Sequence, residues 1–281
     1  MNKGILYIIG TPIGNLDDIT LRAIKTLEMV DIILAEDTRQ TIKLLNHLEI
    51  KKKMISYHRH NEVAKILEVR KLLDEGLNVG LVSDAGMPII SDPGQELVKQ
   101  LIENGYNIQV IPGVTAVITA LVKSGIDSTS FIFQGFLSIN KRIRKEKLKE
   151  LVEETKTSVF YEAPHKILVT LKDMYNVLGD RKICIARELT KIHEEYIYMS
   201  FSEAIEKIEI EGIRGEIVLI VEGIDKKILE SKKGDAISLK SNLELTKELI
   251  SSGMQKKEAI KKVAQMKGIT KNEVYQDCLD I

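Results

Sequence analysis

The chain has 281 residues, of which 44% are apolar and 29% are charged. These values are ordinary for globular proteins and argue against wholesale disorder, and the length is enough for two domains that each bury a core. Lysine plus arginine equals aspartate plus glutamate, at 41 each. The chain therefore lacks the overall positive charge of a general nucleic-acid-binding protein, and a polyanionic partner would have to meet a local basic patch.

The two cysteines, Cys184 and Cys278, are far apart and lack the spacing of a zinc site. We therefore expect reduced, structural thiols and no bound metal. The apolar run near Met1 ends at Gly10, which makes it too short for a signal peptide or a membrane span. These features predict a soluble, cytoplasmic protein.

The first 123 residues alternate short apolar runs with helical patterns. Strands are expected at residues 5–9, 31–35, 79–82 and 108–111, and helices at residues 16–29, 40–48, 63–75 and 94–104. This alternation predicts a first α/β domain, residues 1–123, with a mostly parallel sheet that carries helices on its faces.

A second α/β domain is expected over residues 124–225. Its predicted strands are residues 131–135, 158–161, 182–186, 194–201 and 216–221, with helices near residues 140–149, 165–178 and 202–208. The last two strands are expected to be antiparallel, so this sheet should be mixed.

The rest of the chain is expected to be a linker, residues 224–242, followed by a small helical domain, residues 240–281. Thr270 and Glu273 form a capping-box pattern at the start of the last of its three short helices. The outline resembles a helix-turn-helix, but a packing appendage or a dimer contact is equally compatible with it.

Four loops follow the predicted strands of the first domain at their carboxyl ends, and each is rich in turn-forming or polar residues. They are residues 10–15, 35–39, 83–94 and 111–116. Because carboxyl ends of parallel strands meet at one edge of a sheet, these loops predict a ligand-binding crevice. Loop 10–15 has neither the Gly-x-Gly-x-x-Gly pattern of dinucleotide binders nor the Lys-Ser/Thr of a P-loop.

Each loop offers a particular chemistry. Asp37 and Arg39 could position a hydroxyl or a phosphate, or Asp37 could act as a base; the alternative is a helix N-cap with a local salt bridge. Asp84 could hold a polar ligand that approaches the backbone at Gly86 closely. Thr115 stands at a predicted helix N-terminus, whose amides favour an anionic group such as a carboxylate.

A basic run at residues 140–149 contains six cations and only one acid, Glu146. It could flank the crevice and meet phosphates, or it could be a solvated helix face.

Taken together, these motifs resemble the ribosomal RNA small subunit methyltransferase I family, which belongs to the tetrapyrrole methylase superfamily. The resemblance covers residues 4–223 and rests on Gly10-Thr-Pro-Ile-Gly-Asn-Leu-x-Asp-Ile-Thr20, Ala35-Glu-Asp-Thr-Arg39, Ser83-Asp-Ala-Gly-Met-Pro-x-Ile-Ser-Asp-Pro-Gly94, Ile111-Pro-Gly-Val-Thr-Ala116, Phe133-Gln-Gly-Phe-Leu137, Tyr161-Glu-Ala-Pro-His-Lys166, Ala186-Arg-Glu-Leu-Thr-Lys191 and Arg214-Gly-Glu216.

The resemblance implies a class III methyltransferase fold and a homodimer that binds S-adenosyl-L-methionine between its two α/β domains. It also implies methylation of the ribose 2′-oxygen of a cytidine in the decoding centre of 16S rRNA, within the small ribosomal subunit. The cofactor-binding residues that it implies are Gly10, Pro12, Asp84, Gly86, Met87, Thr115, Ala116, Ala163, Arg187 and Gly215.

Attack of an oxygen on a sulfonium methyl group is an in-line displacement that needs no metal, but a weak hydroxyl nucleophile benefits from a base. Asp37 is the candidate base, Glu188 is its rival, and Arg39 would hold a neighbouring phosphate. Two alternatives stay open. One is a small tetrapyrrole acceptor, which the basic run and the helical tail disfavour; the other is a non-catalytic RNA-binding adaptor.

Overall fold

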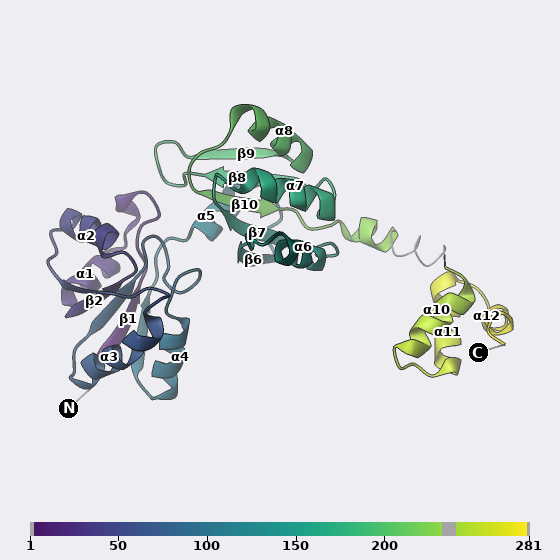
Figure 1. The fold of residues 1–281 in the computed structure, drawn as a ribbon, viewed down its shortest axis with the longest axis horizontal. Helices are drawn as coiled ribbons and strands as arrows, with labels where there is room; N and C mark the ends of the chain where they lie inside the picture. The colour runs from purple at the N-terminus through teal and green to yellow at the C-terminus, as the bar shows by residue number, and fades with distance from the viewer. Residues whose placement is uncertain (1–2, 232–239, 280–281) are drawn as a thin grey trace. The chain divides into compact units, whose positions relative to one another are not determined.

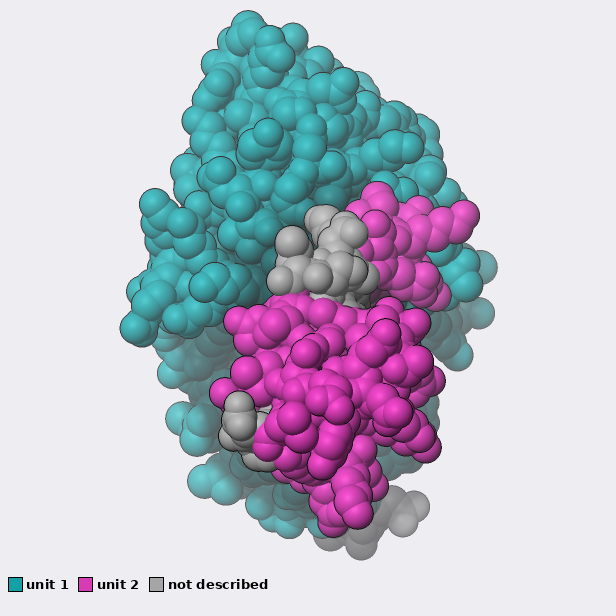
Figure 2. Space-filling model, turned by 90° about the vertical axis from the view of Figure 1, so that its right-hand side faces the viewer, with its two compact units in different colours: residues 1–152, 156–222 teal, residues 153–155, 223–281 magenta. Residues whose placement is uncertain are grey.

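The computed structural model describes residues 3–231 and 240–279. The chain forms two compact units, which Figure 2 draws in different colours. Unit 1 comprises residues 1–152 and 156–222, and unit 2 comprises residues 153–155 and 223–281. Unit 1 contains both sheets. The boundary expected between two α/β domains, after residue 123, therefore stays a prediction. Within the described ranges, no helix has the length and apolar character that crossing a membrane requires.

The first sheet is parallel throughout, with the strand order β3-β2-β4-β1-β5. Figure 1 labels β1 and β2 of this sheet and the helices α1 to α4 around it. Its strands are β1 (Ile5–Ile9), β2 (Ile32–Ala35), β3 (Lys53–Ser56), β4 (Val79–Val82) and β5 (Asn107–Ile111). The predicted parallel sheet is therefore confirmed. Strand β3 was not predicted; it is an edge strand with no fully buried residue and hence no apolar run to mark it.

The helices of this half are α1 (Leu21–Met29), α2 (Thr38–His47), α3 (Glu62–Asp74), α4 (Gln95–Glu103) and α5 (Ala116–Lys123). The single helix expected over residues 16–29 was wrong, because two caps divide it. The Asn15 side chain accepts a hydrogen bond from the Asp17 amide and starts a 3-10 helix at Leu16–Asp18. The Thr20 side chain then accepts from the Ala23 amide and starts α1.

The second sheet is mixed, as expected, with the order β6-β7-β10-β8-β9. Its elements are β6 (Phe131–Phe136), α6 (Lys141–Glu150), β7 (Thr157–Glu162), α7 (Ile167–Leu178), β8 (Lys182–Arg187), β9 (Glu195–Ser200), α8 (Phe201–Glu211) and β10 (Ile217–Val221). Only β6 and β7 pair in parallel; β10 runs antiparallel to β7 and β8, and β9 runs antiparallel to β8.

The two faces of the second sheet are covered by different helices. One core packs α6, α7 and α8 against one face, through residues such as Phe160 and Leu219. On the other face, Val117 and Leu121 of α5 pack against Val159 and Val218. Because α5 follows directly after β5, the last strand of the first sheet, this packing joins the two sheets.

Unit 2 contains α10 (Asn242–Ser251), α11 (Lys256–Lys267) and α12 (Lys271–Asp277). The three expected helices are confirmed, and the Thr270–Glu273 capping box opens α12. Residues 226–231, which were assigned to a linker, are helical. Residues 232–239 of the expected linker lie outside the described residues.

Candidate functional site

Hydrogen bonds tie the loops of the first sheet together at the carboxyl ends of its strands. Thr11, after β1, exchanges backbone hydrogen bonds of 2.9 and 3.1 Å with Gly86, after β4. The Asp84 carboxylate accepts a 3.0 Å hydrogen bond from the Asp37 amide, after β2. The Gly10 amide donates to the Ile111 carbonyl, at the end of β5, over 3.0 Å. The structure thus brings the four loops to one edge.

Three glycines are required where these loops touch. A Cβ on Gly10 would lie 2.7 Å from the Gly113 Cα, so the two backbones can approach only because neither residue has a side chain. Gly86 adopts a φ of +78°, in the left-handed region that favours glycine. These requirements explain Gly10, Gly86 and Gly113 in the loop motifs.

A cavity of about 770 Å³ lies within unit 1 and is lined by both halves of it. Its lining residues are Ile13, Glu36, Asp84, Ala85, Gly86, Met87, Ile90, Ser91, Asp92, Thr115, Ala116, Val117, Phe133, Phe136, Tyr161, Glu162, Ala163, Pro164, Leu189, Glu216, Ile217 and Val218. The volume falls in the range of roughly 300–1,000 Å³ that is typical of small-molecule sites.

Six of the ten residues expected to bind a cofactor line this cavity: Asp84, Gly86, Met87, Thr115, Ala116 and Ala163. The other four are not among its lining residues. Gly10 and Pro12 belong to the loop after β1, and a Cβ on Gly10 would lie 2.8 Å from the Met87 sulfur. Arg187 and Gly215 lie in the second half of unit 1, where Arg187 forms a 2.6 Å ion pair with Glu195.

The three residues expected to be catalytic do not line the cavity. Asp37 caps α2 by accepting the Arg39 amide at 2.8 Å, and it forms a 2.7 Å ion pair with the Arg39 guanidinium. Hydrogen bonds from Arg39 lower the pKa of Asp37 to about 2. Both features of the structural alternative, the N-cap and the local salt bridge, are therefore present. A carboxylate with so low a pKa is a weak base.

Glu188 is held in a similar way. Its carboxylate accepts hydrogen bonds from the Glu216 amide at 2.9 Å and from Lys191 at 3.1 Å. The Glu216 amide is the main cause that lowers the pKa of Glu188, with Lys191 adding to it. A Cβ on Gly215 would lie 2.5 Å from the Glu188 Cγ, so this glycine leaves room for the Glu188 side chain.

Glu36 and Asp92 are two of the acids that line the cavity and that were not among the predicted site residues. Their side chains are hydrogen-bonded to each other. Burial raises the pKa of Glu36, and the neighbouring charges of Asp92 and Asp84 raise it further. Burial and Asp84 likewise raise the pKa of Asp92. Two carboxyl groups that share a hydrogen bond favour a state with one proton between them.

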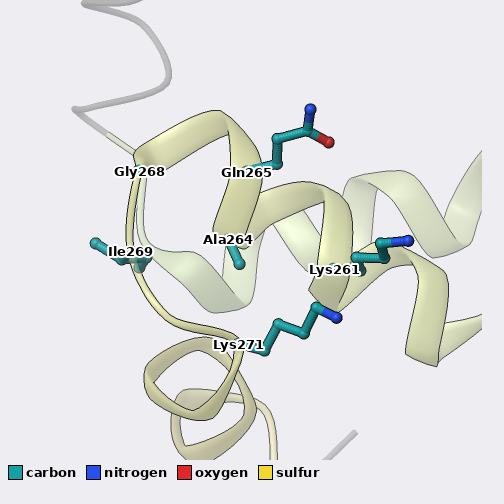
Figure 3. Close-up of a pocket in the computed structure, with 6 residues that line it drawn as sticks. All are labelled: Lys261, Ala264, Gln265, Gly268, Ile269 and Lys271. Atoms are coloured by element: carbon teal, nitrogen blue, oxygen red, sulfur yellow. The ribbon is translucent and has the colours of Figure 1, made fainter.

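Outside this cavity, the described residues provide fewer groups that could bind a ligand or react. A second hollow, of about 380 Å³, lies in unit 2 and is lined by Lys261, Ala264, Gln265, Gly268, Ile269 and Lys271 (Figure 3). Over residues 3–231 and 240–279 no group of histidine, cysteine or acidic side chains is arranged to hold a metal ion. Cys184 and Cys278 are buried free thiols, and burial raises the pKa of Cys184 to about 11.

Comparison with known proteins places the chain in a family. Residues 5–205 match the family Tetrapyrrole (Corrin/Porphyrin) Methylases. The protein named Ribosomal RNA small subunit methyltransferase I of Bacillus subtilis is 45% identical over 98% of this chain and 94% of its own length. The protein of the same name from Thermotoga maritima is 47% identical over 78% of this chain and 99% of its own. The chain belongs to the ribosomal RNA small subunit methyltransferase I family.

Solved structures agree on the fold of this methyltransferase family member. A cobalt precorrin-4 methyltransferase superposes with a TM-score of 0.58 at 20% identity, over 78% of this chain and 94% of its own. The native uroporphyrin III C-methyl transferase from Thermus thermophilus gives 0.55 at 16% identity, over 77% and 97%. The chain therefore has the tetrapyrrole methylase fold. Methyltransferases of this family use S-adenosyl-L-methionine as the methyl donor.

Proposed function

We propose that the chain transfers a methyl group from S-adenosyl-L-methionine to the ribose 2′-oxygen of a decoding-centre cytidine in 16S rRNA. The acceptor would be presented by the small ribosomal subunit in the cytoplasm. The observation that carries the proposal is the 45% identity, over 98% of the chain, to a protein named for methylation of small-subunit ribosomal RNA. The cavity in unit 1 supplies a place for the reaction.

The residues of the cavity fit the cofactor. Five acidic residues line it, and among them the carboxyl groups of Asp84 and Asp92 suit a ligand with a cationic sulfonium and an ammonium group. Val117, at the start of α5, and Val218, on β10, offer apolar surface to an adenine ring. We propose that the lining residues from the predicted set hold the cofactor: Asp84, Gly86, Met87, Thr115, Ala116 and Ala163.

In this proposal, the other four predicted cofactor residues support the loops around the cavity and are not part of its lining. Gly10 lets the loop after β1 lie against Gly113 and Met87, and Pro12 belongs to the same loop. Arg187 donates a 3.4 Å hydrogen bond to the Arg214 carbonyl, next to Gly215. Through this contact, Arg187 would hold the loop that precedes β10 rather than touch the cofactor.

When bound, S-adenosyl-L-methionine supplies an electrophilic methyl group. The chain must align the ribose hydroxyl and accept its proton. We assign the proton acceptor to Glu36, because it lines the cavity and carries a raised pKa, whereas Asp37 and Glu188 lie outside the lining with lowered pKa values. Arg39 is 87% exposed at its side chain, which leaves it accessible to a phosphate of the RNA.

We also propose that the enzyme is a homodimer. Ile118 and Val122 lie one turn apart on α5, and their exposed fractions are 49% and 81%. Val110 is 55% exposed on β5, an edge strand of the first sheet. Apolar side chains on an edge strand and on the next helix support a covered interface, and a second copy of the chain would cover it.

The proposed acceptor is tested by mass spectrometry of rRNA nucleosides from cells that lack the gene. We expect loss of a 2′-O-methylated cytidine derivative from 16S rRNA, restored when the wild-type gene is returned. Unchanged 16S rRNA would contradict the proposal and turn attention to a small-molecule acceptor.

A further inference from the structure

A β-bulge in β6 turns two phenylalanines toward the cavity. In the pairing of β6 with β7, Phe133 lies opposite Val159, the register then shifts, and Phe136 lies opposite Tyr161. Residues three apart in a regular strand point to opposite faces, but one extra residue brings them to the same face. Gly135, within the bulge, has a φ of +66°. Phe133 and Phe136 therefore both line the cavity.

The Phe136 ring is exposed, and it packs against the Tyr161 ring, which is itself held by packing. The Tyr161 ring next to it is half-buried, and Phe133 packs edge-on against it with ring centroids 4.9 Å apart. The Phe136 ring lies 5.5 Å from the Tyr161 ring, yet 61% of Phe136 is exposed. An aromatic face that is held in place and open to solvent at a cavity suits a planar ligand.

Cationic side chains follow Phe136 closely in the sequence. Helix α6 begins five residues after Phe136, and its Lys141 and Arg142 are exposed. The helix is anchored by Arg144, which forms a 2.6 Å ion pair with Asp173; both side chains are at least nine-tenths buried. Arg144 also donates to the carbonyl of Ser138 at 2.9 Å, so the segment between the ring and the helix is held as well.

We propose that Phe136 is the stacking platform for the base of the acceptor nucleotide, and that Lys141 and Arg142 hold the adjoining phosphates. The inference rests on the proposed function and names the part of the site that receives the RNA. A nucleotide whose ribose reaches into a cavity must leave its base stack, and proteins hold such splayed bases against aromatic side chains. Phosphates next to the base meet the cations of α6.

The test compares Phe136 variants in methyl transfer to small ribosomal subunits purified from cells that lack the gene. Loss of one base–aromatic stack weakens binding by roughly 5- to 150-fold. We expect Phe136→Ala to raise KM for the subunits by an amount in this range. Phe136→Tyr, which keeps the ring, should stay close to wild type, whereas Phe136→Leu, which keeps only the apolar character, should resemble Phe136→Ala.

Two controls separate stacking from other effects. Ile139→Ala removes another exposed apolar side chain from the same segment, 76% exposed and outside the cavity lining, and should leave KM unchanged. Calorimetric binding of S-adenosyl-L-methionine should be the same in all variants.

The outcomes distinguish this inference from the proposed function. If wild-type protein methylates the subunits and Phe136→Ala has an unchanged KM, only the stacking role is overturned. The stacking role is also overturned if Phe136→Leu restores KM, or if Phe136→Ala loses cofactor binding. If the wild-type protein binds the cofactor but methylates no subunits, the proposed function falls and the inference falls with it.

Discussion

Two neighbouring acids after β2, Glu36 and Asp37, have opposite surroundings. Glu36 lies among carboxyl groups and is partly buried, so its charged form is disfavoured and its pKa is raised. Asp37 accepts hydrogen bonds from the Arg39 amide and guanidinium, which favour its charged form. At the scale of single residues, Glu36 is therefore suited to exchange a proton and Asp37 is suited to hold the start of α2.

This difference predicts different effects of two isosteric substitutions. Glu36→Gln should lower kcat for methyl transfer by about 10²- to 10⁴-fold, the range for loss of a general base. Asp37→Asn should lower it far less, because the lost interactions are a helix cap and an ion pair. Cofactor binding by calorimetry should stay near wild type in both. If Asp37→Asn abolished transfer while Glu36→Gln kept it, the original assignment of the base to Asp37 would be right.

The assignment of the base to Glu36 predicts how the rate of methyl transfer depends on pH. A base must be ionised to accept a proton, and the pKa of Glu36 lies above the ordinary value of 4.5. The rate in wild type should therefore rise as the pH increases through that raised pKa and then level off. Asp37, with a pKa of about 2, stays ionised across this range and contributes no rise. The residual rate of methyl transfer by Glu36→Gln should not rise with pH over this range.

Helix α5 has three different surroundings along its short length. Its first residue, Ala116, lines the cavity, Ala120 packs in the core of the second sheet, and Val122 is 81% exposed. One element thus connects the first sheet, the second sheet and the surface proposed for dimer formation.

A charge on the exposed side of α5 tests the dimer. Val122→Glu should shift the protein from dimer to monomer, because a desolvated carboxylate opposes an apolar interface. Leu21→Glu on α1, where the side chain is 77% exposed, is the matched control and should stay dimeric. Light scattering at equal concentrations measures both. A monomeric wild type, or a dimeric Val122→Glu, would contradict the proposed surface.

Burial made the central strands of the first sheet easy to predict from the sequence. Strands β1 and β4 are almost wholly buried, so their apolar runs marked both ends of each strand. Strand β3 lies at a sheet edge and carries no such run. The bulge at Gly135 depends on pairing with β7, and only that pairing shows that Phe136 faces the cavity. Local patterns could not reveal either feature.

At the scale of the whole molecule, the site is made by segments far apart in the chain. The cavity lining runs from Ile13 to Val218 and draws on both sheets of unit 1. The turn residues after the parallel strands were enough to predict that the four loops of the first sheet converge. The carboxyl ends of parallel strands meet at one edge of a sheet. Whether Glu36 or Asp37 faces the cavity was beyond that reasoning, since it depends on the N-cap of α2 and on the contact with Asp92.

The central claim is that this cavity holds S-adenosyl-L-methionine, and calorimetry on wild type and a blocked variant tests it most directly. Ala163 lines the cavity, so Ala163→Trp should fill part of it and weaken binding on the order of tenfold or more. Ala64→Trp, at an exposed position of α3, is the control and should bind like wild type. We predict one cofactor per wild-type chain. Absence of binding to wild type, or undiminished binding to Ala163→Trp, would contradict the account.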